Sequence, residues 1–300
     1  MLLVSGGTGF IGSAIVRELL GRGERVAVLG RDASRIRRLF GESVEAREAD
    51  VTRAGQDLDA AMQGVDVVIN SVQFPNSPIE NKARGWTFEN VDLNGTRNQV
   101  DSAKKAGVRR FVYISGAGAA ADAAQHWFRL KWQAEEYVKA SGLEWVIIRP
   151  TWVYGPDDNS LNRILRFASF LPFIPTFGSG KQAMQPVFID DVARVTADAA
   201  LKPEAANHLF ELGGPEVMTM DDVFRTALEV MGRRRPILHQ PVVVGKLLGK
   251  AASLLPNKPL SADAVDFIVQ PAVADNRELE AVLAPKLTPL REGLASYLGK

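Results

Sequence analysis

The first half of the chain alternates short apolar runs with segments of helical spacing. Runs of β-branched and apolar residues predict strands at Leu2–Ser5, Arg25–Leu29, Val44–Glu48, Val65–Asn70, Arg109–Ser115 and Glu144–Arg149. Between these runs, helical spacing predicts helices at Ile11–Leu20, Leu58–Met62, Val91–Ala106 and Phe128–Ala140. Strands that alternate with helices are typical of a parallel sheet covered by helices on both faces. We therefore expect an α/β fold with a doubly wound parallel sheet.

The rhythm changes after Pro150. Prolines become frequent, and the strands predicted at Val187–Ile189 and His208–Leu212 lie among helical segments. We expect residues 1–150 to form one domain, to which segments at about 185–212 return. We expect residues 151–300 to form a smaller, mostly helical lobe over the carboxyl ends of the strands.

Composition and charge exclude several classes of protein. The 300 residues include 36 basic and 35 acidic side chains, so the formal net charge is +1 and gives no overall field to attract nucleic acid. There is no cysteine, and His126, His208 and His239 lie far apart, so we expect no metal site. Since neither a secretory signal nor an apolar run of about 18 residues is visible, we expect a cytoplasmic protein without a transmembrane segment.

The strongest motif follows the first predicted strand and opens the first predicted helix. In the run Gly6-Gly7-Thr8-Gly9-Phe10-Ile11-Gly12, the glycines are spaced GxxGxxG. Such glycines permit a tight turn, let the backbone approach a pyrophosphate and allow close helix–strand packing, while the helix N-terminus attracts the phosphates. The alternative is a plain turn. The motif predicts a Rossmann-type dinucleotide site at Gly6, Thr8, Gly9, Phe10, Ile11 and Gly12.

The tip of the second predicted strand bears on the choice of nucleotide. Arg31 can pair with a 2′-phosphate, whereas the next residue, Asp32, would accept from a ribose hydroxyl or serve as a helix N-cap. Three further arginines at 35, 37 and 38 either add to this charge or form a solvated helix face. We expect NADP(H) to be favoured over NAD(H).

These residues belong to an ordered set of motifs that resembles the short-chain dehydrogenase/reductase superfamily, in its extended and atypical branches, which include NAD-dependent epimerase/dehydratase-like proteins. Beyond the glycine loop, the resemblance rests on Asn94-Gly95-Thr96, Val112–Ser115, Arg149–Pro156 and Val187–Ala193. It implies that the adenine edge is held by Asp50 and Val51. It implies further cofactor contacts at Asn70, Ser71, Val72, Ser115, Lys131, Pro150, Thr151 and Val153.

The catalytic pattern of this superfamily is incomplete in the chain. Active relatives use Tyr-x-x-x-Lys with a Ser or Thr, because the ammonium lowers the pKa of the phenol that exchanges the proton. Lys131 matches the lysine, but Trp127 occupies the tyrosine position and Ala117 the serine position. An indole N–H cannot act as an acid or base near neutral pH. Tyr154 is the best substitute, although packing is its usual role.

Further segments suggest a branch of the superfamily. The insertion Gln73–Glu80 could form a lid over the nicotinamide end of the site. Together with three later segments, it makes the chain resemble the branch of the 39-kDa accessory subunit of respiratory complex I and its bacterial relatives. The later segments are Leu260–Val265, Asp275-Asn276 and Leu290–Leu294. The resemblance implies bound NADPH and a structural, assembly or redox-sensing role, through a protein partner or a respiratory-type membrane complex. The alternatives are an active NADP-dependent reductase, dehydrogenase or epimerase on a small, fairly apolar substrate and, third, a regulator of transcription factors.

Three other features remain open. The apolar run Val242–Leu255, with lysines four residues apart, could lie in a membrane interface, against a partner, or in the lobe with a solvated lysine edge. Phenylalanines could line an apolar pocket or form a core cluster: Phe167, Phe170, Phe173 and Phe177. The triplet Arg233-Arg234-Arg235 is expected at the surface.

Overall fold

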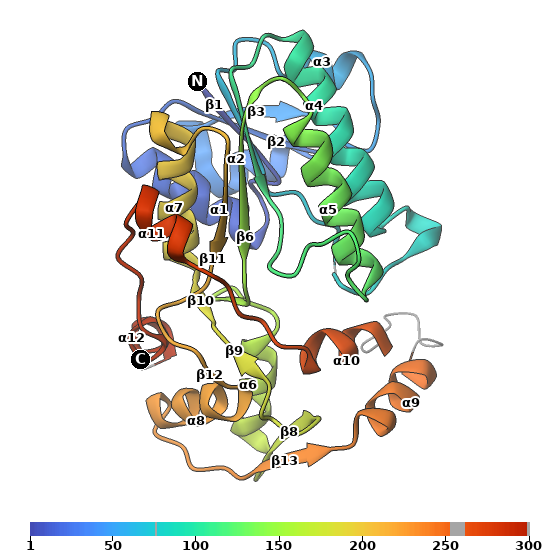
Figure 1. Ribbon diagram of the computed structural model, residues 1–300, viewed down its shortest axis with the longest axis vertical. Helices are drawn as coiled ribbons and strands as arrows, with labels where there is room; N and C mark the ends of the chain where they lie inside the picture. Colours follow the sequence, from blue (N-terminus) through green and yellow to red (C-terminus); the bar gives the residue numbers. More distant parts are fainter. Residues whose placement is uncertain (76, 253–261, 299–300) are drawn as a thin grey trace.

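The centre of the molecule is a seven-stranded parallel sheet, which the computed structural model shows together with its flanking helices for residues 1–75, 77–252 and 262–298 (Figure 1). Its strand order is β11-β6-β5-β4-β1-β2-β3, and every neighbouring pair is parallel. The strands are β1 (Leu2–Ser5), β2 (Val26–Gly30), β3 (Glu45–Glu48), β4 (Val67–Asn70), β5 (Arg110–Ile114), β6 (Glu144–Pro150) and β11 (His208–Leu212). The predicted α/β fold with a doubly wound sheet is confirmed.

Helices cover both faces of this sheet because its strands bury side chains on both sides. Along β1, Leu2 and Val4 pack on one face, whereas Leu3 packs on the other. The first face is covered by α1 (Phe10–Gly21), α2 (Ala33–Phe40), α7 (Ile189–Leu201) and α11 (Arg277–Val282) (Figure 1). The second is covered by α3 (Gln56–Ala61), α4 (Gly95–Lys105) and α5 (His126–Lys139).

The helix predicted over Val91–Ala106 differs from the observed one at its start. Residues Phe88–Asn94 form a π-helical segment, η3, and α4 begins only at Gly95. The Thr96 hydroxyl donates to the Asp92 carbonyl at 2.5 Å, so it competes for a backbone acceptor within this segment. A π-helical turn is uncommon and often accompanies a functional site.

Most of the remaining elements pack around a third apolar core below the carboxyl ends of the strands, and we call all of the remaining elements the C-terminal lobe (Figure 1). Its helices are α6 (Leu161–Phe170), α8 (Met220–Val230), α9 (Val242–Ala252), α10 (Ala262–Val269) and α12 (Leu290–Leu298). Its strands form three two-stranded ladders: β7 (Val153–Tyr154) with β10 (Val187–Phe188), β9 (Ala183–Met184) with β12 (Met218–Thr219), and β8 (Ile174–Phe177) with β13 (Ile237–Gln240). None of the described helices has the length and apolarity that crossing a bilayer requires.

Apart from the start of α4, the observed element ends lie close to the predicted ones, with one small correction. The strand predicted to reach Ile189 stops at Phe188, because Ile189 already opens α7. Short 3-10 turns lie at Gly41–Ser43, Lys82–Arg84 and Pro203–Ala205. Parts of three predicted segments lie outside the described residues: Asn76, Ser253–Leu255 and Leu260-Ser261.

Candidate nucleotide site

The glycine loop between β1 and α1 is closed against the end of β4. Gly6 has φ +77°, and a Cβ there would lie 2.9 Å from the backbone of Ser71. A Cβ on Gly12 would lie 2.3 Å from the Gly6 carbonyl oxygen. The Ser71 hydroxyl and N–H both donate to the Ser5 carbonyl, at 2.8 and 3.0 Å. Only glycine therefore fits at either position in this loop.

The N-terminus of α1 opens onto this loop without a competing cap. Gly9 is the N-cap residue, no side chain caps the helix, and its first turn contains no acidic residue. The unpaired N–H groups and the helix dipole make this end a site for an anion. Thr8 and Gly9 lie in the loop itself, whereas Phe10 and Ile11 also pack against the C-terminal lobe.

The arginines after β2 lie beside the same loop. Arg31 is exposed and makes no hydrogen bond or ion pair within the described residues. Asp32 takes the second of its two predicted roles: it is the N-cap of α2 and accepts from the Arg35 N–H at 3.0 Å. The Ser34 hydroxyl and that N–H hold the pKa of Asp32 below its usual range. The guanidinium of Arg35 donates to the Thr8 carbonyl at 3.3 Å. Arg35 therefore reaches the glycine loop, although a solvated helix face was the favoured expectation for it.

The site residues predicted at the ends of β3 and β4 form hydrogen bonds mainly with neighbouring protein groups. Asp50 accepts from the Thr52 hydroxyl at 2.8 Å, and the Val51 carbonyl accepts from Asn98 at 2.9 Å. Buried Asn70 donates to Thr96 at 2.9 Å and accepts from the Val72 N–H at 3.1 Å. These contacts fix the backbone around the glycine loop.

Lys131 faces the Asp92 carboxylate, which was not among the predicted site residues. Its ammonium donates to Asp92 Oδ1 at 3.0 Å and lies 5.8 Å from the centre of the Tyr113 ring. The Asp92 side chain is 1% exposed, and its Oδ2 has no hydrogen-bond partner in the described structure. Burial raises the pKa of Asp92, although Lys131 opposes the shift. Burial would lower the pKa of Lys131, but Tyr113 and Asp92 raise it on balance.

Ser115 is committed to a second buried network. Its hydroxyl donates to Glu135 Oε1 at 2.5 Å, and Glu135 is fully buried. Arg149 donates to both oxygens of the same carboxylate, at 2.8 and 2.5 Å. Such a bidentate pair fixes both side chains. The Ala117 N–H donates to the Pro150 carbonyl at 2.9 Å, so the serine position of active relatives is held close to β6 but carries no hydroxyl.

Trp127 is the centre of an aromatic cluster at the position of the missing tyrosine. It is 3% exposed, stacks on Phe88 at 6.1 Å between ring centres, and meets Phe267 of α10 at 6.4 Å. Its indole N–H has no partner within the described residues. Phe74 of the predicted insertion packs edge-on against Phe88 at 4.8 Å, and Glu80 accepts from the Phe88 N–H at 2.9 Å. The described part of the insertion thus packs on this cluster.

The other predicted residues near the C-terminal lobe have structural contacts. The Thr151 N–H donates to the Leu212 carbonyl at 3.0 Å, and Val153 pairs with Val187. Tyr154 is fully buried, and its hydroxyl reaches the Leu290 carbonyl at 3.5 Å. Burial raises the pKa of Tyr154 well above its usual range. This environment suits packing better than proton transfer.

Comparison with protein families gives a match over most of the chain. A family described as NAD(P)H-binding matches residues 6–203, from the glycine loop to just beyond the end of α7. Subunit 9 of the NADH dehydrogenase [ubiquinone] 1 alpha subcomplex, from Arabidopsis thaliana mitochondria, is 28% identical over 85% of the chain and 64% of its own length. The chain therefore spans less than two thirds of that relative.

Two further similarities are with reductases. NAD(P)H azoreductase from Xenophilus azovorans is 30% identical over 78% of the chain and 74% of its own length. The structure of an NADPH-dependent quinone oxidoreductase from Escherichia coli, complexed with NADPH, superposes with a TM-score of 0.78 at 18% identity, and the match covers 99% of each chain. At 18% identity, the similarity to the quinone oxidoreductase shows a shared fold and nothing more.

Proposed function

The chain belongs to the NAD(P)H-binding family, in the atypical part of the short-chain dehydrogenase/reductase superfamily, and we propose that it holds NADP(H) as a structural or redox-sensing group. The uncapped N-terminus of α1 and the two positions that admit only glycine support a bound pyrophosphate. Gly6, Thr8, Gly9 and Gly12 would hold this group.

The preference for NADP(H) is supported by charge beside the loop. Arg31 has no partner among the described residues, and Arg35 already reaches the Thr8 carbonyl. Two guanidinium groups suit a phosphate dianion, and Asp32 is occupied as an N-cap. Asp50 and Val51 would border the adenine, and Asn70, Ser71 and Val72 would support the middle of the nucleotide.

The observation that carries the non-catalytic role is the packing of Trp127. Bound nicotinamide supplies a hydride, and reduction of a carbonyl needs a proton donor beside it. Here an indole surrounded by Phe88 and Phe267 stands where the phenol would be. Lys131, which would lower the pKa of such a phenol, is paired with Asp92. The side chains of Lys131 and Ser115 would then hold the protein around the bound cofactor in place and would not transfer protons.

Nucleotide retention and turnover test this proposal on the same preparation. Native mass spectrometry of gently purified protein should show one NADPH per chain, and consumption of NADPH with a panel of carbonyl substrates should remain at background. If the missing phenol alone limits the reaction, Trp127→Tyr should raise the rate of carbonyl reduction. Trp132→Tyr, a matched control in the same helix, should leave that rate at background. Rapid carbonyl turnover by the unaltered protein would contradict the proposed role.

A second function is favoured by the similarity to the azoreductase. Quinones and azo compounds accept a hydride and can take the accompanying proton from water, so they do not require a tyrosine. The products would be the reduced acceptor and NADP⁺. Turnover of such acceptors without turnover of carbonyls would select this second function.

A partner complex is also part of the proposal. The relative from Arabidopsis is named as a subunit of a respiratory dehydrogenase, which supports a peripheral position at a membrane complex. Recovery of the chain with a stoichiometric partner from gently solubilised membranes would support this role, whereas recovery as a free chain would contradict it.

A further inference from the structure

The start of α2 lies against the glycine loop. The Gly6 N–H donates to the Leu29 carbonyl of β2 at 3.3 Å. From the first turn of α2, the Arg35 guanidinium donates to the Thr8 carbonyl, also at 3.3 Å. A charge at the start of α2 is therefore close to the loop that would hold the nucleotide, and its sign bears on which nucleotide binds.

Two carboxylates lie at this start of α2. Asp32 is the N-cap residue, and its Oδ1 accepts from the Ser34 hydroxyl at 2.5 Å and from the Arg35 N–H at 3.0 Å. These contacts, the hydroxyl first, hold the pKa of Asp32 below its usual range, so the carboxylate is charged at neutral pH. Glu48, the last residue of β3, accepts from the Ala33 N–H at 3.0 Å. Both acids would repel a 2′-phosphate unless cations offset them.

Arg38 reaches back along α2 towards Asp32. Its Nη1 donates to the Ser34 hydroxyl at 2.9 Å, and its Nη2 lies 3.7 Å from Asp32 Oδ2. The side chains of Arg38 and Asp32 are 66% and 53% exposed, so their attraction adds little to stability. The charge matters more: Arg31, Arg35 and Arg38 against two carboxylates leave one net positive charge. Without Arg38, the sum is zero.

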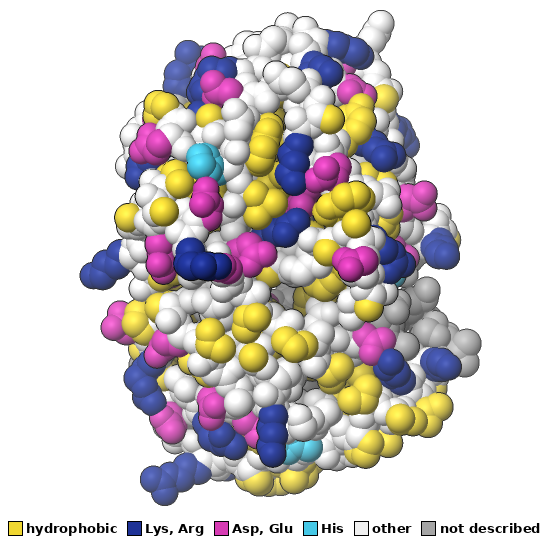
Figure 2. Space-filling view, in the orientation of Figure 1, with side chains coloured by type: hydrophobic (Ala, Val, Ile, Leu, Met, Phe, Trp, Pro, Cys, Tyr) yellow, Lys and Arg dark blue, Asp and Glu magenta, His cyan; other side chains and the backbone are white. Residues whose placement is uncertain are grey.

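The rest of the molecule supplies no field that would replace this charge. The formal net charge of the chain is +1, and Figure 2 shows basic and acidic side chains interspersed over the visible face. Exposed charges further away than a Debye length, about 8 Å at physiological salt, are largely screened. The balance of charge at the start of α2 is therefore set locally.

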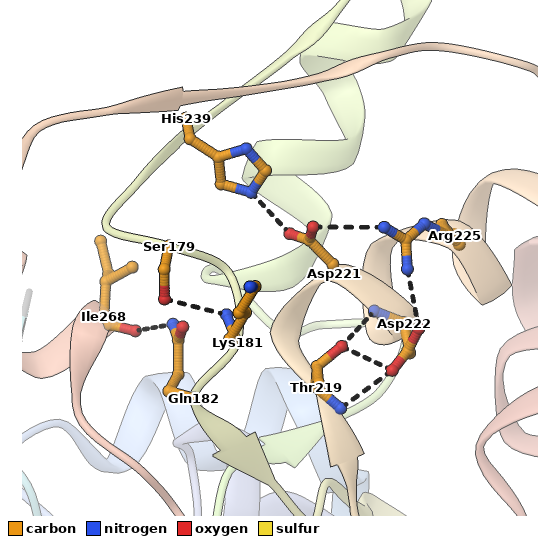
Figure 3. A network of polar contacts seen from close by, with 9 residues as sticks. All are labelled: Ser179, Lys181, Gln182, Thr219, Asp221, Asp222, Arg225, His239 and Ile268. Carbon is orange, nitrogen blue, oxygen red and sulfur yellow. Dashed lines mark hydrogen bonds and ion pairs between the residues drawn. The ribbon is translucent and has the colours of Figure 1, made fainter.

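A comparable contact at the start of α8 shows what such an arginine does away from the glycine loop. Asp222 closes a capping box with Thr219, and the Arg225 guanidinium donates to Asp222 Oδ1 at 2.8 Å and to Asp221 Oδ2 at 3.3 Å (Figure 3). There the arginine only completes the start of a helix in the C-terminal lobe. An arginine beside a capping acid thus indicates no ligand by itself, and the glycine loop beside α2 makes the difference.

From these contacts we infer that Arg38 determines nucleotide specificity by offsetting the charge of Asp32. This role rests on the proposed preference for NADP(H), and it adds a positioning residue that acts through the acid and needs no contact with the nucleotide. Loss of Arg38 leaves the Asp32 carboxylate unopposed beside the loop. An unopposed carboxylate there repels a 2′-phosphate and attracts the hydroxyl donors of an unphosphorylated ribose.

Nucleotide binding by Arg38→Ala tests this role in the full chain. In fluorescence titrations at low salt, the Kd for NADPH should rise and the Kd for NADH should fall, so that the preference for NADPH shrinks roughly tenfold. The effect should fade in high salt, because the charges are exposed. Arg38→Lys, which keeps the charge, should retain most of the preference. Melting temperatures without nucleotide should change little, since the pair is exposed.

Asp32→Asn distinguishes a charge effect from a structural one. Asparagine also caps helices well, so α2 should keep its start, and Arg38→Ala should no longer change the preference in the Asp32→Asn background. The controls are Arg37→Ala in α2 and Arg225→Ala in α8, and both should leave the preference unchanged.

Two outcomes would overturn the inference alone. One is a preference for NADPH that Arg38→Ala leaves intact. The other is an equal loss of preference in the Asp32→Asn background, because Arg38 would then act on the nucleotide directly. Equal affinity of the unaltered protein for NADPH and NADH would instead contradict the proposed preference for NADP(H), on which this role rests.

Discussion

Breaking the buried pair of Asp92 and Lys131 should destabilise the fold strongly. Their atoms are 3.0 Å apart, and the two side chains are 1% and 11% exposed. Removing one partner of a buried pair costs about 3–5 kcal/mol, because the remaining charge is buried and unpaired. Asp92→Asn keeps the shape and one acceptor, and the Tyr113 ring offers Lys131 about 1 kcal/mol of cation–π attraction. We therefore expect Asp92→Asn to lower the free energy of unfolding by about 2–4 kcal/mol.

The double variant distinguishes a coupled pair from two independent contributions. Lys131→Met leaves the Asp92 carboxylate buried and should cost about 3–5 kcal/mol. Asp92→Asn/Lys131→Met removes both charges, so its loss should be smaller than the sum of the single losses by at least about 2 kcal/mol. Urea unfolding of the four proteins, followed by circular dichroism, gives these free energies. Additive losses, within about 0.5 kcal/mol, would refute the coupling inferred from the geometry.

Three further changes test the nucleotide site and its surroundings. Arg31→Ala should weaken NADPH binding by roughly 10- to 150-fold and leave NADH binding unchanged, as measured by fluorescence titration, whereas Arg37→Ala should change neither. Gly12→Ala should abolish NADPH binding because its Cβ would lie 2.3 Å from the Gly6 carbonyl oxygen, whereas Gly21→Ala, with open space around its Cβ, should be tolerated. Burial raises the pKa of Tyr113 to about 12, so the folded state keeps this proton longer than the unfolded state, and stability should fall as pH rises from about 10 to about 12. Burial also raises the pKa values of Tyr154 and Tyr297, so Tyr113→Phe should reduce that loss in unfolding titrations without abolishing it, and an unchanged profile would contradict the assignment.

The sheet could be predicted from the sequence because its signals are local. Parallel strands buried on both faces appear as continuous apolar runs, and the predicted ends of Leu2–Ser5 and His208–Leu212 match the observed strands. The glycine loop could be predicted for the same reason, since its turn and the following helix are contiguous. Of the strands in the ladders of the C-terminal lobe, only β10 was predicted, as Val187–Ile189. The others were missed because they are two to four residues long and pair distant segments.

The contacts that define the candidate site are not local. Asp92 meets Lys131 across 39 positions, and nothing in the pattern of the central helix marks that aspartate as buried. Arg35 follows the spacing of an exposed helix face, yet its long side chain reaches back to Thr8. Tyr154 follows a strand beside the expected nicotinamide, but packing against α12, 136 positions away, determines where its hydroxyl lies.

A structural role and a sensing role make different demands on this site. A ligand that binds only the folded state adds about 2.7 kcal/mol of stability when its concentration is 100 times its Kd, comparable to the loss expected for Asp92→Asn. Stabilisation of this kind needs no preference between NADPH and NADP⁺. Sensing needs different affinities for the two forms, because a ligand shifts an equilibrium only through differential binding. The aromatic cluster around Trp127 links the insertion, α5 and α10. If this cluster responds to the redox state of the nicotinamide, the NADPH and NADP⁺ complexes should differ in melting temperature. Trp127→Ala should then diminish that difference. Equal melting temperatures with both forms would leave the structural role alone.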